Sequence, residues 1–175
     1  MKYKQSKTSQ TSGSDLERQA IDLHESFTRA MQHHGSGRLH EAANTYQNIL
    51  QSYPSHPVAL HLLGVISHQV GKSEIAIDLI TRAIAIQPDY FKAHNNLGNV
   101  LRDLGKQKEA LASYQKALAI KPNYAEALSN LGNILKDLGR LDEAIASYRQ
   151  AITLKPDYAD AHNNLGNALK ELGNL

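Results

Sequence analysis

The sequence predicts an all-α fold, a solenoid of stacked antiparallel helix pairs. Four of the five prolines lie 34 residues apart, at Pro54, Pro88, Pro122 and Pro156. Nine of the eleven glycines follow the same step in two series. Within each step, apolar residues recur with the period of about 3.6 residues that marks a helix. A fixed period of this length indicates a repeat architecture, which is decided before any local element is assigned.

The 34-residue step divides the chain into six segments. The first is rich in Ser, Thr, Gln and Lys, so we expect a disordered tail there. Next come a degenerate first unit and three full units, of which the last two are identical at 18 of 34 positions. The final segment supplies the first helix of a further, truncated unit or a terminal helix. The expected segments are residues 1–14, 15–56, 57–90, 91–124, 125–158 and 159–175.

Each unit is expected to form a helix, a turn and a second helix. In the unit 125–158, apolar residues fall on one side of a helix over 125–139, and a second helical pattern runs from Leu141 to Leu154. Pro156 ends the second pattern, because proline cannot continue a helix. Gly132 and its equivalents lie within the first helix, where glycine costs about 1 kcal/mol relative to alanine. We therefore expect a packing reason for it, the close approach of two helix backbones.

Composition and charge exclude several classes of protein. The chain has no cysteine, which excludes a disulfide scaffold, a cysteine nucleophile and a thiolate metal site. The formal net charge is only +2, which argues against a dedicated binder of nucleic acid or membrane surfaces. No apolar run reaches the roughly 18 residues of a membrane span, and no apolar stretch follows the basic N-terminus as in a secretory signal. A reducing, cytoplasmic location is the default expectation.

The motif within the units resembles a known repeat family. The unit 125–158 reads Leu128-x-x-Leu131-Gly132-x-x-Leu135, then Ala144-x-x-x-Tyr148-x-x-Ala151 and Pro156. This pattern resembles the tetratricopeptide repeat, although the family's usual Trp is replaced by Leu60, His94, Leu128 and His162. The resemblance covers residues 20–175 and implies a right-handed solenoid in which the first helix of each pair lines a concave groove. In the first unit the match fails in the first helix, where Arg29 and Ala30 replace the Leu-Gly pair.

The polar face of each first helix carries a regular set of side chains. The sixth and ninth residues of three successive units are asparagines, and the fifth residue is asparagine in two of them. The twelfth residue is always basic. These candidate peptide-binding residues are Asn96, Asn130 and Asn164; Asn99, Asn133 and Asn167; Asn95 and Asn163; and Arg102, Lys136 and Lys170.

Two explanations of these asparagines stay open at this point. An amide side chain offers both a donor and an acceptor, so a row of amides suits the backbone of an extended peptide whatever its sequence. The row is also similar to that of O-GlcNAc transferases, where the resemblance implies that an asparagine at the place of Asn96, Asn130 and Asn164 binds the substrate backbone. Alternatively, the asparagines provide solubility and hydrogen bonds between repeats. The basic residues, each followed by Asp or Glu, are expected to form a solvated rim.

The expected function is a non-enzymatic protein-interaction module that binds an extended protein or peptide segment and needs no cofactor or metal. No set of residues combines a nucleophile, a base and an oxyanion site. The clamp with which some members of the family bind a terminal carboxylate is absent, because Glu126 and Asp160 stand where it needs basic residues. One alternative is the substrate-recruiting N-terminal piece of a larger O-GlcNAc transferase-like enzyme. Another is self-association through an unpaired apolar face of the last helix.

Four histidines are considered for roles beyond the solvated surface. His61 and His68 are seven residues apart on one helix face, but no carboxylate or third histidine is obviously placed to complete a metal site with them. His94 and His162 occupy the place of the family's Trp, and we expect them to be partly buried packing residues.

Overall fold

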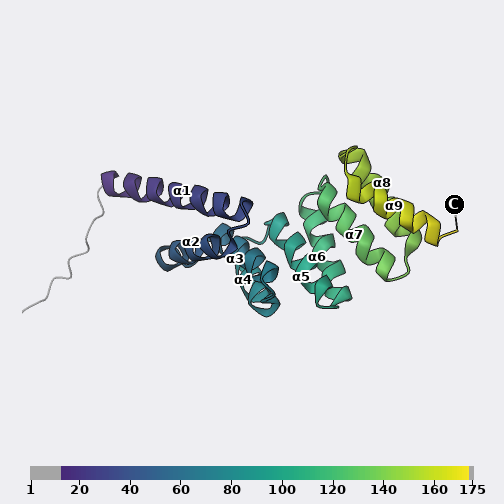
Figure 1. Ribbon diagram of the computed structural model, residues 1–175, viewed down its shortest axis with the longest axis horizontal. Helices are drawn as coiled ribbons and strands as arrows, with labels where there is room; N and C mark the ends of the chain where they lie inside the picture. Colours follow the sequence, from purple (N-terminus) through teal and green to yellow (C-terminus); the bar gives the residue numbers. More distant parts are fainter. Residues whose placement is uncertain (1–12, 174–175) are drawn as a thin grey trace, which may run out of the picture.

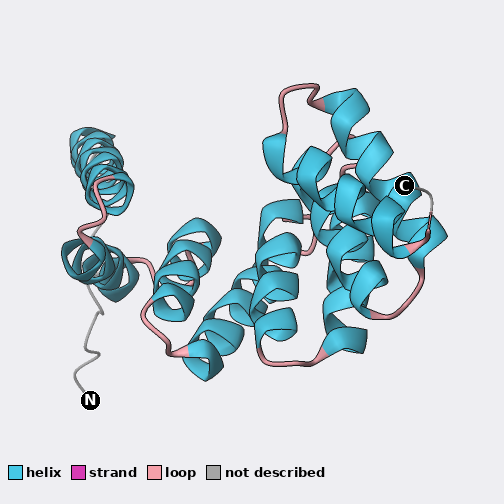
Figure 2. Ribbon diagram, turned by 45° about the vertical axis from the view of Figure 1, so that its right-hand side comes forward, coloured by secondary structure: helices cyan, strands magenta, loops and turns pink. Residues whose placement is uncertain are grey.

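The computed structural model describes residues 13–173, and within that range every regular element is a helix. The helices follow one another in an elongated stack, with α1 at one end and α9 at the other (Figure 1). Short loops connect them (Figure 2). Their bounds are α1 Gly13–Gly35, α2 Leu39–Ser52, α3 Pro57–Gln69, α4 Ser73–Ile86, α5 Phe91–Asp103, α6 Gln107–Ile120, α7 Ala125–Asp137, α8 Leu141–Leu154 and α9 Ala159–Glu171.

The helices form antiparallel pairs that stack on one another. The closest packing is within the pairs α1/α2, α3/α4, α5/α6 and α7/α8, and each second helix also packs on the first helix of the next pair. The first helices contact one another in the order α3, α5, α7 and α9. The predicted all-α solenoid is thus confirmed. The tail expected over residues 1–14 lies almost wholly outside the described residues, and α1 begins at Gly13.

Each pair turns at a glycine with a positive φ. Gly37, Gly71, Gly105 and Gly139 have φ between 73° and 80°. This left-handed conformation is accessible to glycine at no steric cost. At Gly139, the backbone N–H of Arg140 donates to the carbonyl of Leu135 at 2.9 Å, which satisfies an otherwise unpaired carbonyl at the end of α7. One of the two glycine series in the sequence therefore marks the turns within the pairs.

The second glycine series marks places where the partner helix leaves no room for a side chain. A Cβ at Gly132 would lie 2.5 Å from the ring of Tyr148, and one at Gly98 would lie 2.5 Å from the ring of Tyr114. The expectation of touching backbones is therefore wrong at these two positions, because a buried tyrosine ring fills the space. At Gly64 the nearest atoms belong to Ile80 and to the backbone of Ala76.

The first helix differs from its equivalents in length and packing. The helix α1 has 23 residues, whereas α3, α5, α7 and α9 have 13 each. Ala30, which replaces the helix glycine here, is fully buried, and Phe27 packs against Tyr46 with ring centroids 5.9 Å apart. The degenerate first unit thus folds as a helix pair. Of the described residues, no helix is both long and apolar enough to cross a membrane.

Candidate functional site

The predicted peptide-binding residues meet in a hollow formed by three first helices. The hollow has a volume of about 290 Å³ and is lined by α3, α5 and α7. Four of the predicted residues line it, together with His68, Asp103 and others. We call it the polar hollow; its predicted residues are Asn96, Asn99, Arg102 and Asn130. The structure therefore brings side chains from two successive units to one surface.

The sixth residue of each unit bonds back to the preceding unit. Asn96 donates from Nδ2 to Nε2 of His61 at 2.8 Å. Asn130 donates from Nδ2 to Oδ1 of Asn95 at 3.0 Å. In the third case, Asn164 donates to Oδ1 of Asn133 at 3.0 Å. These asparagines therefore link the repeats, as the alternative explanation of the row supposed.

Asn95 lies beneath the surface of the groove and connects two of these asparagines. Only 4% of it is exposed. It donates from Nδ2 to Oδ1 of Asn96 at 3.3 Å while it accepts from Asn130. Asn163, its equivalent in α9, is exposed. In this geometry Asn95 positions its neighbours, whereas Asn163 is open to solvent.

The ninth residue of each unit is held by a tyrosine of the partner helix. The hydroxyl of Tyr114 donates to Oδ1 of Asn99 at 2.8 Å, and that of Tyr148 donates to Oδ1 of Asn133 at 2.8 Å. Burial raises the pKa of Tyr114 to about 12 and also raises the pKa of Tyr148, so both hydroxyls stay protonated donors at neutral pH. The amide oxygens are thereby fixed toward the core.

This tyrosine contact was not predicted, although the sequence contains a signal for it. Asn99 and Tyr114, like Asn133 and Tyr148, are 15 residues apart. In the unit 57–90 the same two places hold Val65 and Ile80, an apolar pair. Comparing both places across the units would have shown that the polar pair and the apolar pair change together.

Each amide keeps a group that makes no hydrogen bond within the described part of the chain. For Asn99 and Asn133 this group is the Nδ2 donor, because their oxygens accept from tyrosine. For Asn130 and Asn164 it is the Oδ1 acceptor, because their nitrogens donate to the preceding unit. All four residues are partly exposed. The surface therefore offers free donors and free acceptors from neighbouring helices.

The basic residues form a rim of weak ion pairs. Arg102 lies 3.2 Å from the carboxylate of Asp103, which also accepts from His68 at 3.0 Å. Lys136 lies 4.0 Å from Asp137. Since these groups are partly exposed, each pair contributes about 0–1 kcal/mol at most. Lys170 and Asn167, on α9, are exposed.

The four histidines considered from the sequence have different surroundings. His61 is bonded to Tyr90 and Asn96, and His68 to Ser73 and Asp103. Each therefore has its own partners, and over residues 17–173 no group of three side chains is arranged to hold a metal ion. His94 is 8% exposed and donates to the carbonyl of Pro88 at 2.9 Å, as expected of a packing residue.

His162 does not become the packing residue that was expected. It is exposed, although its ring nitrogen donates to the carbonyl of Pro156 at 2.8 Å just as His94 does to Pro88. The difference is one of packing. No described helix follows α9, so the side of His162 that a further pair would cover is open.

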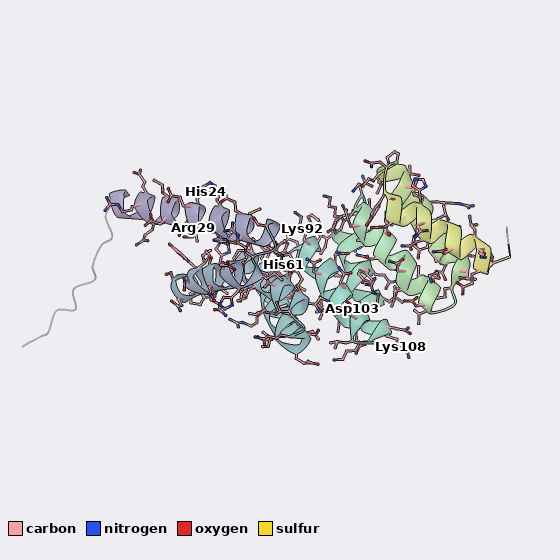
Figure 3. All side chains as sticks on the ribbon, viewed as in Figure 1. His24, Arg29, His61, Lys92, Asp103 and Lys108 are labelled. Carbon is pink, nitrogen blue, oxygen red and sulfur yellow. The ribbon has the colours of Figure 1, made fainter. Side chains whose placement is uncertain are left out.

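His61 shows how burial sets the protonation of the groove. It is 2% exposed, and its pKa is lowered to about 4 by burial and, secondarily, by the charge of Lys92. Since Asn96 donates to Nε2, the ring proton lies on Nδ1 and is donated to the Tyr90 hydroxyl, 2.9 Å away. Figure 3 labels His61 and Lys92, near the start of α5, and Asp103 at its other end.

Removing the tyrosine hydroxyls separately should test their contribution. We expect Tyr114→Phe to lower the free energy of unfolding by about 1 kcal/mol, because it removes a hydrogen bond to Asn99. Tyr46→Phe should cost nothing or stabilise slightly, because the Tyr46 hydroxyl is buried and has no hydrogen-bond partner. Urea denaturation followed by circular dichroism measures both. Equal losses in the two variants would contradict this assignment.

Family models match the C-terminal half of the chain. A model described as TPR repeat matches residues 98–139 and 132–173, and one described as tetratricopeptide repeat matches residues 79–112. Together they cover residues 79–173, which is more than half of the 175 residues. In the comparison with curated proteins, none matches the chain significantly.

Solved structures share the fold at low sequence identity. A MamA fragment from Desulfovibrio magneticus RS-1 is 20% identical and has a TM-score of 0.74, over 86% of this chain and 85% of that chain. A chain from the APC/C hetero-tetramer Cut9–Hcn1 is 20% identical and has a TM-score of 0.78, over 84% of this chain and 30% of that chain. The first TPR domain of Spaghetti (RPAP3), bound to the HSP90 peptide SRMEEVD, is 26% identical, with a TM-score of 0.65, over 67% and 93%.

The matched residues include the helix glycines Gly98 and Gly132 and the tyrosines that pack on them, Tyr114 and Tyr148. The repeat period, the helix pairs, the family models and the solved structures agree. The chain belongs to the tetratricopeptide repeat family.

Proposed function

We propose that this chain is a protein-interaction module that binds an extended peptide segment along the face formed by α3, α5, α7 and α9. The observation that carries the proposal is the set of unused amide groups on that face. The donors of Asn99 and Asn133 and the acceptors of Asn130 and Asn164 are available, while the other end of each amide is held by the fold.

Such a surface suits the main chain of a peptide. Each peptide unit presents one N–H donor and one C=O acceptor, and an extended segment presents both at regular intervals. Because the opposite ends of the amides are already bonded, less side-chain entropy is lost when a ligand binds. The amides carry no charge, so recognition by them is largely independent of the charges on the ligand.

The RPAP3 complex supports a peptide as the class of ligand, since that protein of the same family binds an HSP90 peptide. The chemistry of recognition differs in this chain. Glu126 and Asp160 are exposed where a carboxylate clamp needs basic residues. These two carboxylates would repel a terminal carboxylate. We therefore propose an internal, extended segment rather than a free C-terminus.

The test uses a peptide selected for this chain. The tightest 12-residue peptide from a displayed random library is labelled with fluorescein, and its Kd is measured by fluorescence anisotropy. We expect the variant Asn96→Ala/Asn130→Ala/Asn164→Ala to bind roughly 10- to 100-fold more weakly, since each lost hydrogen bond is worth about 1 kcal/mol.

The matched control removes three exposed asparagines that lie away from this face, as Asn44→Ala/Asn48→Ala/Asn123→Ala. This control should bind like the unmodified protein. If the groove variant also keeps its full affinity while its circular dichroism spectrum is unchanged, recognition through the asparagines is excluded.

The resemblance to O-GlcNAc transferases supports a more specific form of the same proposal. The groove would then recruit protein substrates for a transferase domain encoded beyond Leu175. Reading the coding sequence past this residue distinguishes the two forms, because a stop codon there excludes the transferase. The binding test above is the same for both.

Self-association through α9 is the remaining expectation. The apolar residues Leu154 and Leu172 are 42% and 39% exposed, and a Cβ at Gly166 would meet no atom within 4 Å. Light scattering between micromolar and millimolar concentrations tests this role, which predicts a rising mean mass that Leu172→Lys abolishes. A constant monomer mass excludes it.

A further inference from the structure

An apolar hollow lies beside the polar hollow, toward the N-terminal end of the solenoid. It has a volume of about 710 Å³ and lies between α1, α2 and α3. Its side chains are mainly apolar, with one imidazole, one phenol and one amide. We call it the apolar hollow; the side chains that define it are Met31, His34, Leu39, Tyr46, Leu62 and Gln69.

The apolar hollow continues the same face of the solenoid. Met31 is the ninth residue of its unit, the place held by Asn99 and Asn133 further along. Leu62 is the sixth residue of its unit, the place held by Asn96 and Asn130. Gln69 lines both hollows, and it accepts from His34 at 3.0 Å across the first two units. The amide row therefore ends where an apolar surface begins.

The lining of the apolar hollow includes a buried hydroxyl without a partner. Tyr46 is fully buried, and its hydroxyl makes no hydrogen bond. The equivalent tyrosines, Tyr114 and Tyr148, donate to an asparagine, but here Met31 stands in that place. Burial raises the pKa of Tyr46 to about 12, so the hydroxyl remains a donor. An unpaired buried donor is costly, and an acceptor brought by a ligand would remove that cost.

The lining also restricts the kind of side chain that fits. No residue that lines the apolar hollow is Asp, Glu, Lys or Arg, so a charged side chain would lose water without gaining a partner. Met31 is 61% exposed and is flexible, so it can adapt to the shape of an apolar ligand. The volume falls in the usual range of small-ligand pockets and exceeds the need of one leucine or phenylalanine.

We propose that the apolar hollow binds one large aliphatic or aromatic side chain of the extended peptide, and that the Tyr46 hydroxyl donates to a backbone carbonyl of that residue. The inference rests on the proposed function, since the amides hold the peptide along the same face. The amides would bind any extended backbone, whereas the apolar hollow would select the residue that enters it. It therefore fixes the register of the segment.

The test uses the side-chain methyl of Met31 as a reporter. The sequence has only two methionines, so labelling their methyl carbons with ¹³C gives two NMR signals. N-acetyl-leucine methylamide should shift the Met31 signal saturably, with an apparent Kd about tenfold or more below those of N-acetyl-glycine methylamide and N-acetyl-lysine methylamide. A response to glycine or lysine equal to that to leucine would overturn the proposal.

Two variants separate this site from the amide row. Met31→Asn supplies Tyr46 with the acceptor found in the other units, so it should raise the Tm while it weakens binding of the leucine probe about tenfold, followed by the amide signals of Leu62 and Gln69. Undiminished leucine binding by that variant would contradict the assignment. The variant Asn96→Ala/Asn130→Ala/Asn164→Ala should keep the Met31 response, because those residues do not line the apolar hollow. Weakening of the 12-residue peptide by the amide variant is measured separately, so failure of either site is recognised by itself.

Discussion

Replacing Gly132 by alanine should lower the free energy of unfolding by about 1–3 kcal/mol. The new Cβ would lie 2.5 Å from the ring of Tyr148, which is fully buried and cannot move without disturbing α7 and α8. Overpacking of this kind costs about 1–3 kcal/mol. The cost outweighs the gain of about 1 kcal/mol that alanine normally brings to a helix. Urea denaturation followed by circular dichroism measures the change.

Gly166→Ala is the matched control, because Gly166 holds the same place in α9 and a Cβ there would meet no atom within 4 Å. Only the helix propensity acts at this position, so stability should rise by up to about 1 kcal/mol. Opposite signs for two identical substitutions at equivalent places would establish the tyrosine ring as the cause. If Gly132→Ala stabilised the protein as much as Gly166→Ala, the packing described for α7 and α8 would be wrong.

The stability of the fold should fall as the pH is lowered from 6.5 to 4, in part because of His61. Burial and Lys92 lower its pKa to about 4, whereas an unfolded histidine has a pKa of about 6.5. Between these values the unfolded chain binds the proton and the folded chain does not, so stability is lost as the pH falls. The loss from His61 reaches about 2–3 kcal/mol near pH 4. His56, whose pKa is also lowered by burial, acts in the same direction.

The variant His61→Asn isolates this contribution. It places at 61 the residue that the next unit holds at 95, where Asn95 accepts from Asn130 as His61 accepts from Asn96. Thermal or urea unfolding of both proteins should show a difference in stability that changes by about 2–3 kcal/mol between pH 7 and pH 4. A difference that stays constant over this range would mean that His61 titrates in the folded protein as it does in a peptide.

The repeat geometry was predictable because it depends on few residues with strong backbone preferences. Pro88, Pro122 and Pro156 end helices, and glycines such as Gly139 adopt a positive φ that other residues avoid. These effects are local and recur every 34 residues, so they are visible in the sequence. The packing role of the second glycine series was also visible, but its partner was not, since the ring of Tyr148 approaches from the other helix of the pair.

The candidate site was predictable only in part, because its chemistry depends on contacts between units. The sequence places Asn95 and Asn96 on one polar face, yet Asn95 is buried by the neighbouring unit and Asn96 is not. Orientation of the Asn99 amide depends on a tyrosine 15 residues away. The role of the asparagines in peptide binding stays a prediction. The apolar hollow depends on Met31 and Leu62 from different units, which no single helical pattern brings together.

The most direct measurement of the central claim, recognition of a peptide backbone by the amides, is a comparison of two ligands with the same side chains. The selected 12-residue peptide is synthesised once normally and once with alternate backbone nitrogens methylated, which removes their donors. Titration calorimetry gives both Kd values. Recognition through the free acceptors of Asn130 and Asn164 predicts that methylation weakens binding at least about tenfold. Equal affinity of the two peptides would contradict it.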